Sequence, residues 1–145
     1  MEYLIRNIEL AEEGRQKISW VRSRMPILRG LEEEFEKEKP FKGLKITVSV
    51  HLEAKTAYLA KVLHAGGANV RVTGSNPLST QDAITAGLVS DGIEVFAWHN
   101  ATPEEYETHI RKALEFGPDI IIDDGGDLVN MLHTEMPELC KNILG

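Results

Sequence analysis

The sequence predicts an α/β fold: a Rossmann-like or flavodoxin-like parallel sheet with helices on both faces, preceded by an N-terminal helical segment. After residue 43, four short runs rich in β-branched residues alternate with stretches of helical apolar spacing. Strands separated by helices pair in parallel, because each helix carries the chain back to the start of the sheet. The 145 residues are enough for the core of one domain. The order of the strands cannot be read from the sequence.

The first part of the chain is expected to be helical. Apolar side chains recur at roughly helical spacing over residues 1–38. Pro26 interrupts this pattern, because the residue before a proline disfavours helical geometry. We therefore divide the chain into an N-terminal helical segment, 1–42, and an α/β part, 43–145.

The repeating units of the α/β part are assigned from composition and helix caps. The β-branched runs predict strands over 44–50, 69–74, 93–98 and 119–122. Helical spacing predicts helices over 53–65, 79–89 and 102–116, with short helices at the end of the chain. Ser79 or Thr80 can cap the second of these helices, and Thr102 can cap the third.

Charge and composition disfavour several classes of partner. The net charge of -7 disfavours binding to nucleic acid or to an anionic membrane surface. No apolar run approaches the ~20 residues that a membrane span needs, and the charged residues 1–11 are unlike a signal peptide. The single cysteine, Cys140, cannot form an internal disulfide and is expected to be a packing residue. We therefore expect a cytoplasmic protein.

Polar side chains follow the end of every predicted strand. They are His51, Glu53 and Lys55 after the first strand, Ser79 after the second, His99 after the third, and Asp123 and Asp124 after the fourth. The carboxyl ends of parallel strands meet at one edge of a sheet, where ligands bind. We therefore expect these groups to converge on one crevice.

Each of these groups also has a purely structural explanation. His51 could be a half-buried histidine bonded to backbone, and Ser79 could be only a helix cap. The adjacent Asp123 and Asp124 cannot point the same way if the backbone is extended. One carboxylate can accept hydrogen bonds from the Gly-Gly turn that follows, while the other projects into the crevice. A carboxylate in that place could hold a ribose hydroxyl or move a proton.

Three other kinds of site find no support in the sequence. The acidic run lacks the spacing of an EF-hand, and no HExxH motif occurs, so no metal site is predicted. An acidic pair also marks phosphoryl-acceptor domains, but there the pair follows the first strand. The dinucleotide fingerprint GxGxxG is absent, so no cofactor-binding residues are predicted in this chain.

Four segments, in the right order, resemble the N-terminal part of the S-adenosylhomocysteine hydrolase family. They are HLEAKT (51–56), SNPLSTQD (75–82), VFAW (95–98) and IIDDGGDL (121–128). The resemblance covers nearly the whole chain, and its second and fourth segments are the most specific. It identifies the part 43–145 as a partial substrate-binding domain.

The resemblance implies a reversible cleavage of S-adenosylhomocysteine to adenosine and homocysteine. In that family NAD oxidises the ribose 3'-hydroxyl, which acidifies the neighbouring C–H. A base removes that proton, homocysteine leaves, water adds, and the ketone is reduced again. The implied partners are therefore NAD and a nucleoside–homocysteine thioether, and the full-length family members are homo-oligomers.

The resemblance also implies roles for individual residues. Asp124 would contact the ribose and assist proton transfer, and His51 would lie beside the ribose and the thioether carbon. Thr56 would line the base pocket. The expected catalytic residues are thus His51 and Asp124, and the expected substrate-binding residues are Glu53, Lys55, Thr56, Ser79 and Asp124.

Two residues depart from the family pattern. Many members carry Thr where this chain has Glu53, and Glu or Gln where it has Lys55. The second position faces the 6-amino group of adenine, which needs an acceptor, whereas lysine offers donors only. Lys55 would suit a carbonyl, as in hypoxanthine, so we hypothesise a preference for S-inosylhomocysteine. The alternative is that Lys55 turns outward and pairs with Glu53 or solvent.

The family chain continues with a Glu-Thr-Thr-Thr segment, a catalytic Lys and Asp, and an NAD-binding domain, none of which this sequence contains. We therefore expect a substrate-domain fragment that is inactive by itself. Two alternatives are a standalone nucleoside-binding or regulatory module, and a structural domain whose polar strand ends are only caps.

Overall fold

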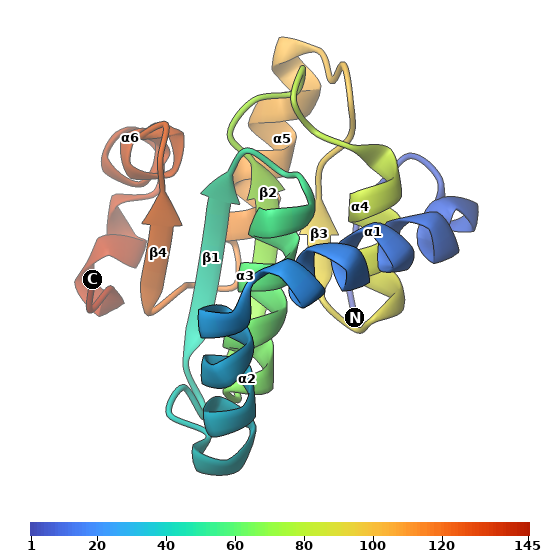
Figure 1. Ribbon diagram of the computed structural model, residues 1–145. Coiled ribbons are helices and arrows are strands. Elements are labelled where there is room, and N and C mark those ends of the chain that lie inside the picture. The colour runs from blue at the N-terminus through green and yellow to red at the C-terminus, as the bar shows by residue number, and fades with distance from the viewer.

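The computed structural model describes all 145 residues and confirms the α/β fold with helices at its start (Figure 1). In chain order the elements are η1 (Ile8–Leu10), α1 (Ala11–Arg24), α2 (Pro26–Glu38), β1 (Lys45–Val50), α3 (Ala54–Ala65), β2 (Asn69–Gly74), α4 (Asp82–Ser90), β3 (Glu94–Phe96), α5 (Pro103–Leu114), β4 (Ile120–Asp123), α6 (Asp127–Thr134) and η2 (Pro137–Asn142). None of these helices is both long enough and apolar enough to cross a bilayer.

The four strands form one parallel sheet in the order β3-β2-β1-β4. The chain adds β2 and β3 on one side of β1 and then crosses back to place β4 on the other side. Right-handed crossovers in opposite directions put their helices on opposite faces of the sheet. The direction of the chain therefore reverses between β1 and β4, and open parallel sheets bind ligands at such a switch point.

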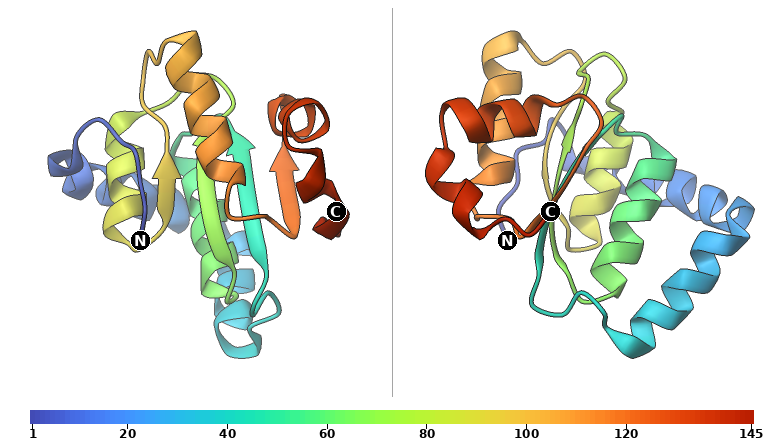
Figure 2. Two further views of the ribbon diagram at one scale, coloured as in Figure 1. Left: turned by 180° about the vertical axis from the view of Figure 1, so that it is seen from behind. Right: turned by 90° about the vertical axis from the view of Figure 1, so that its left-hand side faces the viewer.

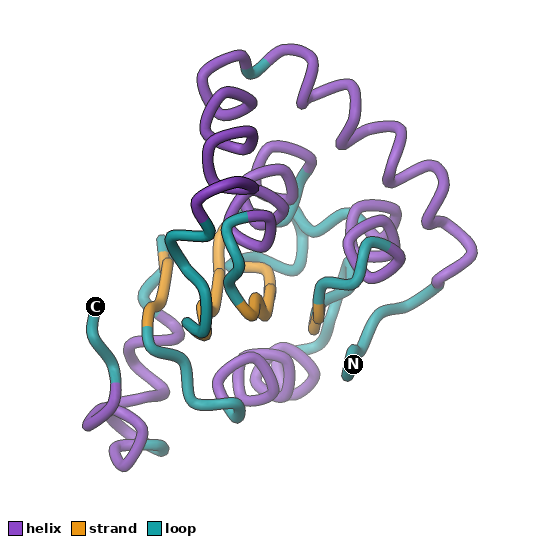
Figure 3. The backbone as a smooth tube through the Cα atoms, turned by 90° about the horizontal axis from the view of Figure 1, so that it is seen from below, coloured by secondary structure: helices purple, strands orange, loops and turns teal.

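Helices cover both faces of the sheet, as predicted. Seen along its edge, the sheet separates α1, α2, α3 and α4 on one face from α5 and α6 on the other (Figure 2, right). The view from below shows the strands between the same two layers (Figure 3). The larger core cluster lies under the first layer and includes Ile18 and Val21 of α1. The N-terminal segment is thus packed into the same core as β1 and β2.

The first residues differ from the predicted helix over 1–38. Leu4 makes an isolated parallel bridge to Phe96, with its N–H 2.9 Å from the carbonyl of Val95. Helical structure begins only at η1, where the side chain of Asn7 accepts a hydrogen bond from the N–H of Glu9. The exposed edge of β3 offers unpaired backbone groups, and the extended N-terminus satisfies some of them.

The start of α4 also differs from prediction. The helix begins at Asp82, and neither Ser79 nor Thr80 caps it. Both hydroxyls instead lie 3.1 Å from the carbonyl oxygen of Asn76, inside the preceding loop. Local bonds of this kind compete with capping. The predicted cap of α5 is confirmed, since Thr102 forms a capping box with Glu105.

Candidate functional site at the switch point

The candidate site lies where β1 and β4 end side by side. Ser49 pairs with Asp123 in the register of these strands, and the N–H of Asp124 donates to the carbonyl of Ser49 at 3.2 Å. His51 leaves the end of β1, and Asp124 leaves the end of β4. Both residues are exposed. The sheet therefore brings to one rim two groups that are 73 positions apart in the sequence, as the strand-end argument predicted.

Ser79 joins the same rim from the loop after β2. Its Oγ atom lies 2.6 Å from Nδ1 of His51. The loop is held by Asn76, whose side-chain oxygen accepts from the N–H of Leu78 at 2.8 Å. The backbone N–H of Gln81 also donates to the carbonyl of Leu52, which ties this loop to the start of α3. A hydroxyl held in this way can orient the imidazole.

The two adjacent aspartates divide their tasks as expected. Asp123 accepts from the N–H of Gly126 and from the N–H of Val129, both at 3.0 Å, so its carboxylate holds the start of α6. Asp124 makes no side-chain hydrogen bond or ion pair within the chain and is exposed to solvent. Its carboxylate is therefore free to accept bonds from a ligand.

The start of α3 carries the remaining predicted residues. Oε1 of Glu53 accepts from the N–H groups of Lys55 and Thr56, at 3.0 and 3.1 Å, and caps the helix. One carboxylate oxygen of Glu53 thus stabilises the start of α3. Lys55 is exposed, and its ammonium group forms neither the ion pair with Glu53 nor any other. Thr56 is buried, and its hydroxyl has no partner within the chain.

One contact behind the rim was not anticipated from the sequence. The hydroxyl of Tyr106 in α5 donates toward Oδ2 of Asp127 at 2.7 Å and lies 3.0 Å from the carbonyl of Ser75. Burial and the neighbouring Asp127 raise the pKa of Tyr106, so this phenol stays protonated. The bond connects the loop after β2 to the first turn of α6. A tyrosine in an amphipathic helix gives no sequence signal of such a role.

Two serine hydroxyls near the rim, those of Ser49 and Ser75, are buried without a hydrogen-bond partner. His99 was also expected there. Its backbone N–H donates to the carboxylate of Asp82 at 2.8 Å. Asp82 therefore holds the end of β3 against the start of α4. No three His, Cys, Asp or Glu side chains converge in an arrangement that could hold a metal ion.

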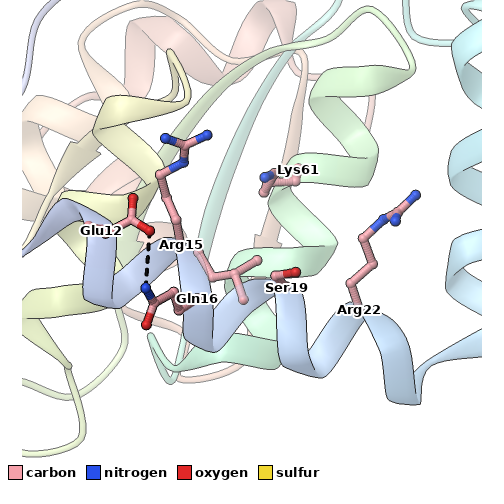
Figure 4. A pocket seen from close by; sticks show the side chains of 7 residues that line it. Glu12, Arg15, Gln16, Ser19, Arg22 and Lys61 are labelled. Carbon is pink, nitrogen blue, oxygen red and sulfur yellow. Dashed lines mark hydrogen bonds between the residues drawn. The ribbon is translucent and has the colours of Figure 1, made fainter.

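The larger cavities lie away from this rim. One of about 390 Å³ runs between α1 and α3 and is lined by Arg15, Arg22 and Lys61 (Figure 4). These cations already have partners, since Arg15 and Lys61 pair with Asp91 and Arg22 pairs with Glu32. This cavity is therefore not a free anion site. The rim at the switch point is an open surface, bounded by side chains of three loops.

Comparison with known proteins gives one consistent result. A family model described as S-adenosyl-L-homocysteine hydrolase matches residues 2–143. An S-inosyl-L-homocysteine hydrolase of Methanocaldococcus jannaschii is 50% identical over 143 residues, and one of Methanopyrus kandleri is 48% identical over 144 residues. An adenosylhomocysteinase of Pyrococcus abyssi is 49% identical over 144 residues. These alignments cover 99% of this chain but 34% of each relative, so the chain spans about a third of their length.

Proposed function

The chain belongs to the S-adenosyl-L-homocysteine hydrolase family, and we propose that it supplies the substrate-binding part of a nucleoside–homocysteine thioether hydrolase. The observation that carries this proposal is the meeting of His51, Ser79 and Asp124 at the switch point of a parallel sheet. Ligands of such sheets bind at this edge.

We assign the ribose to the free carboxylate of Asp124. A carboxylate that no protein donor satisfies can accept bonds from vicinal hydroxyls or take up a proton. The neighbouring Asp123 is less suited to this role, because each of its oxygens already accepts a bond from a backbone N–H group. His51 is assigned to the region of the ribose and the thioether carbon, as the family resemblance implies.

We assign the base to the start of α3. Thr56 has an unbonded hydroxyl there, and the unpaired ammonium group of Lys55 can donate to a carbonyl oxygen. This chemistry favours a hypoxanthine base, and hence S-inosylhomocysteine, over adenine. The relatives do not decide the matter, because those with either name are about equally similar to this chain. An adenine base is the alternative if Lys55 stays in solvent.

NAD, which the family resemblance implies, does not fit the residues at the switch point. A pyrophosphate needs free N–H groups at a helix start and glycines that let the backbone approach it. Here the start of α3 is capped by the carboxylate of Glu53, and that of α6 by Asp123. Both positions repel a second anion. We therefore assign NAD to the part of the relatives that this chain does not span, and we propose that the chain alone is inactive.

A titration with inosine and adenosine tests the proposal. We expect weak binding of nucleoside to the chain, lost in Asp124→Ala and retained in Glu36→Ala, which removes an exposed carboxylate of α2. Binding that survives in Asp124→Ala would contradict the assignment of the ribose.

A second experiment separates the hydrolase part from a standalone nucleoside-binding module. The chain is mixed with NAD and the C-terminal two-thirds of the Methanocaldococcus jannaschii relative, and release of homocysteine from the thioether is measured. Activity that needs both pieces supports the hydrolase. Nucleoside binding without activity in the mixture supports the module, and activity of the chain alone would contradict the proposed inactivity.

A further inference from the structure

We propose that Ser79 is a positioning residue that holds His51 in the tautomer with its proton on Nε2. The neutral imidazole then presents a hydrogen-bond donor to the open rim and does not act there as a base. The first argument is the distance between Nδ1 of His51 and Oγ of Ser79, which is 2.6 Å. Bonds donated by an N–H to an oxygen are about 2.7–3.2 Å long, with a preference near 2.9 Å, whereas hydroxyl donors to oxygen reach about 2.5 Å. The short distance indicates that the hydroxyl is the donor.

The second argument is that the other acceptor near Ser79 is already occupied. The carbonyl of Asn76 accepts from the N–H groups of Ser79 and Thr80, both at 3.2 Å. The hydroxyl of Thr80 also lies 3.1 Å from it and, being buried, has no alternative acceptor. A carbonyl oxygen has two lone pairs. The Ser79 hydroxyl lies 3.1 Å from the same oxygen and would be a fourth donor to it. Because its distance to Nδ1 of His51 is shorter, at 2.6 Å, and the carbonyl is already crowded, we infer that its proton is directed to His51.

The position of the proton on the ring follows directly. When Nδ1 accepts a hydrogen bond, a neutral imidazole carries its proton on Nε2. Given the proposed function, this N–H would donate to an oxygen or the sulfur of the thioether substrate. Proton abstraction would then fall to a carboxylate such as Asp124 or to a group outside this chain. The tautomer itself does not depend on that function.

The tautomer can be measured by long-range proton–nitrogen NMR of the histidine rings at pH 8, without nucleoside. Loss of one set of signals in His51→Gln identifies His51 among the five histidines. We expect a single Nε2–H tautomer in the unmodified chain. In Ser79→Ala the ring should populate both tautomers, so the averaged Nδ1 resonance should move upfield, toward that of a protonated nitrogen, and Ser79→Thr should restore the original signals. Leu78→Ala, in the same loop and exposed, should leave them unchanged.

A proton on Nδ1 in the unmodified chain would overturn the proposal, and so would unchanged His51 signals in a folded Ser79→Ala variant. If Ser79→Ala does not fold, the tautomer of the unmodified chain and of Ser79→Thr still decides between the two directions of the bond. Because no ligand is present, a negative result here leaves the nucleoside proposal standing. Absence of nucleoside binding would likewise leave the tautomer result intact.

Discussion

Gly14 of α1 lies directly against the backbone of Ala83 in α4. A Cβ atom at Gly14 would be 1.7 Å from the carbonyl oxygen of Ala83, and one at Gly87 would be 2.9 Å from the carbonyl carbon of Gly14. The two helices approach so closely because both contact positions lack a side chain. This contact packs the N-terminal segment onto the α/β layer.

Gly14→Ala is therefore expected to destabilise the chain. The added methyl meets backbone, which cannot rotate away, so the helices must separate, at a cost of about 1–3 kcal/mol or more. Urea unfolding followed by circular dichroism measures the free energy of unfolding. Gly30→Ala in α2 is the matched control, because its Cβ would meet open space. This control should stabilise by roughly 0.5–1 kcal/mol. Equal effects at both glycines would contradict the packing argument.

Tyr106→Phe should loosen the loop that carries Asp124. The substitution leaves Oδ2 of Asp127 and the carbonyl of Ser75 without their shared donor. A loss of about 1–3 kcal/mol is expected for such partly buried groups. Faster amide hydrogen exchange at Gly125 and Gly126 would locate the change. Tyr3→Phe serves as control, because Tyr3 is exposed and its hydroxyl has no partner. Unchanged exchange in Tyr106→Phe would show that the bond does not hold the loop.

Asp123→Ala should cost stability that Asp124→Ala does not. Asp123 caps α6 through two backbone bonds, and loss of a helix cap costs about 0.5–2 kcal/mol. Asp124 has no bond within the chain, so its replacement should change the unfolding free energy by less than roughly 0.5 kcal/mol. Thermal and urea unfolding of the two variants provide the comparison. A larger loss of stability in Asp124→Ala than in Asp123→Ala would mean that the two carboxylates exchange roles in solution.

Stability should fall in acid partly because of His109. This residue is buried against Trp98, with ring centroids 4.1 Å apart. Burial lowers the pKa of His109 to about 4 from 6.5. Between pH 6.5 and pH 4, His109 is therefore mostly protonated in the unfolded chain and mostly neutral in the folded chain. The resulting stability is present above about pH 6.5 and is lost as the pH falls toward 4.

The difference between pH 7 and pH 5 should amount to about 2 kcal/mol for this group. His109→Gln keeps a polar side chain that does not titrate, so it should remove that part of the pH dependence. Urea unfolding at both pH values gives the comparison with the unmodified chain. The same pH dependence in both proteins would show that His109 is not the group responsible.

Lys55→Glu should reverse the preference between the two nucleosides. We expect the unmodified chain to bind inosine more tightly than adenosine, because an ammonium group donates to the 6-carbonyl. A glutamate would instead accept from the 6-amino group. A mismatched hydrogen bond costs about 1–3 kcal/mol, or roughly 5- to 150-fold in the ratio of dissociation constants. Titration calorimetry measures both constants, with Lys42→Glu as a control of equal charge on an exposed residue. An adenosine preference that Lys55→Glu leaves unchanged would contradict the assignment.

The sequence alone was enough to predict the class of fold and the polar residues that follow the ends of the strands. The strands, the helices and the Thr102 cap each depend on residues that are close together in the chain. Their patterns can therefore be recognised in the sequence. Because parallel strands end at a common edge, the residues at the candidate site could also be named. The division between Asp123 and Asp124 was expected from their adjacent positions as a pair of roles, and only the family resemblance named Asp124 as the residue that faces the substrate.

Only the tertiary structure decided how those parts meet. The strand order, the bond between His51 and Ser79 and the bond between Tyr106 and Asp127 join residues far apart in sequence. The pairing of Leu4 with β3 and the late start of α4 also depend on neighbours that local propensity does not include. Such contacts form because they lower the free energy of the whole packed chain. That free energy cannot be inferred from a short window of sequence.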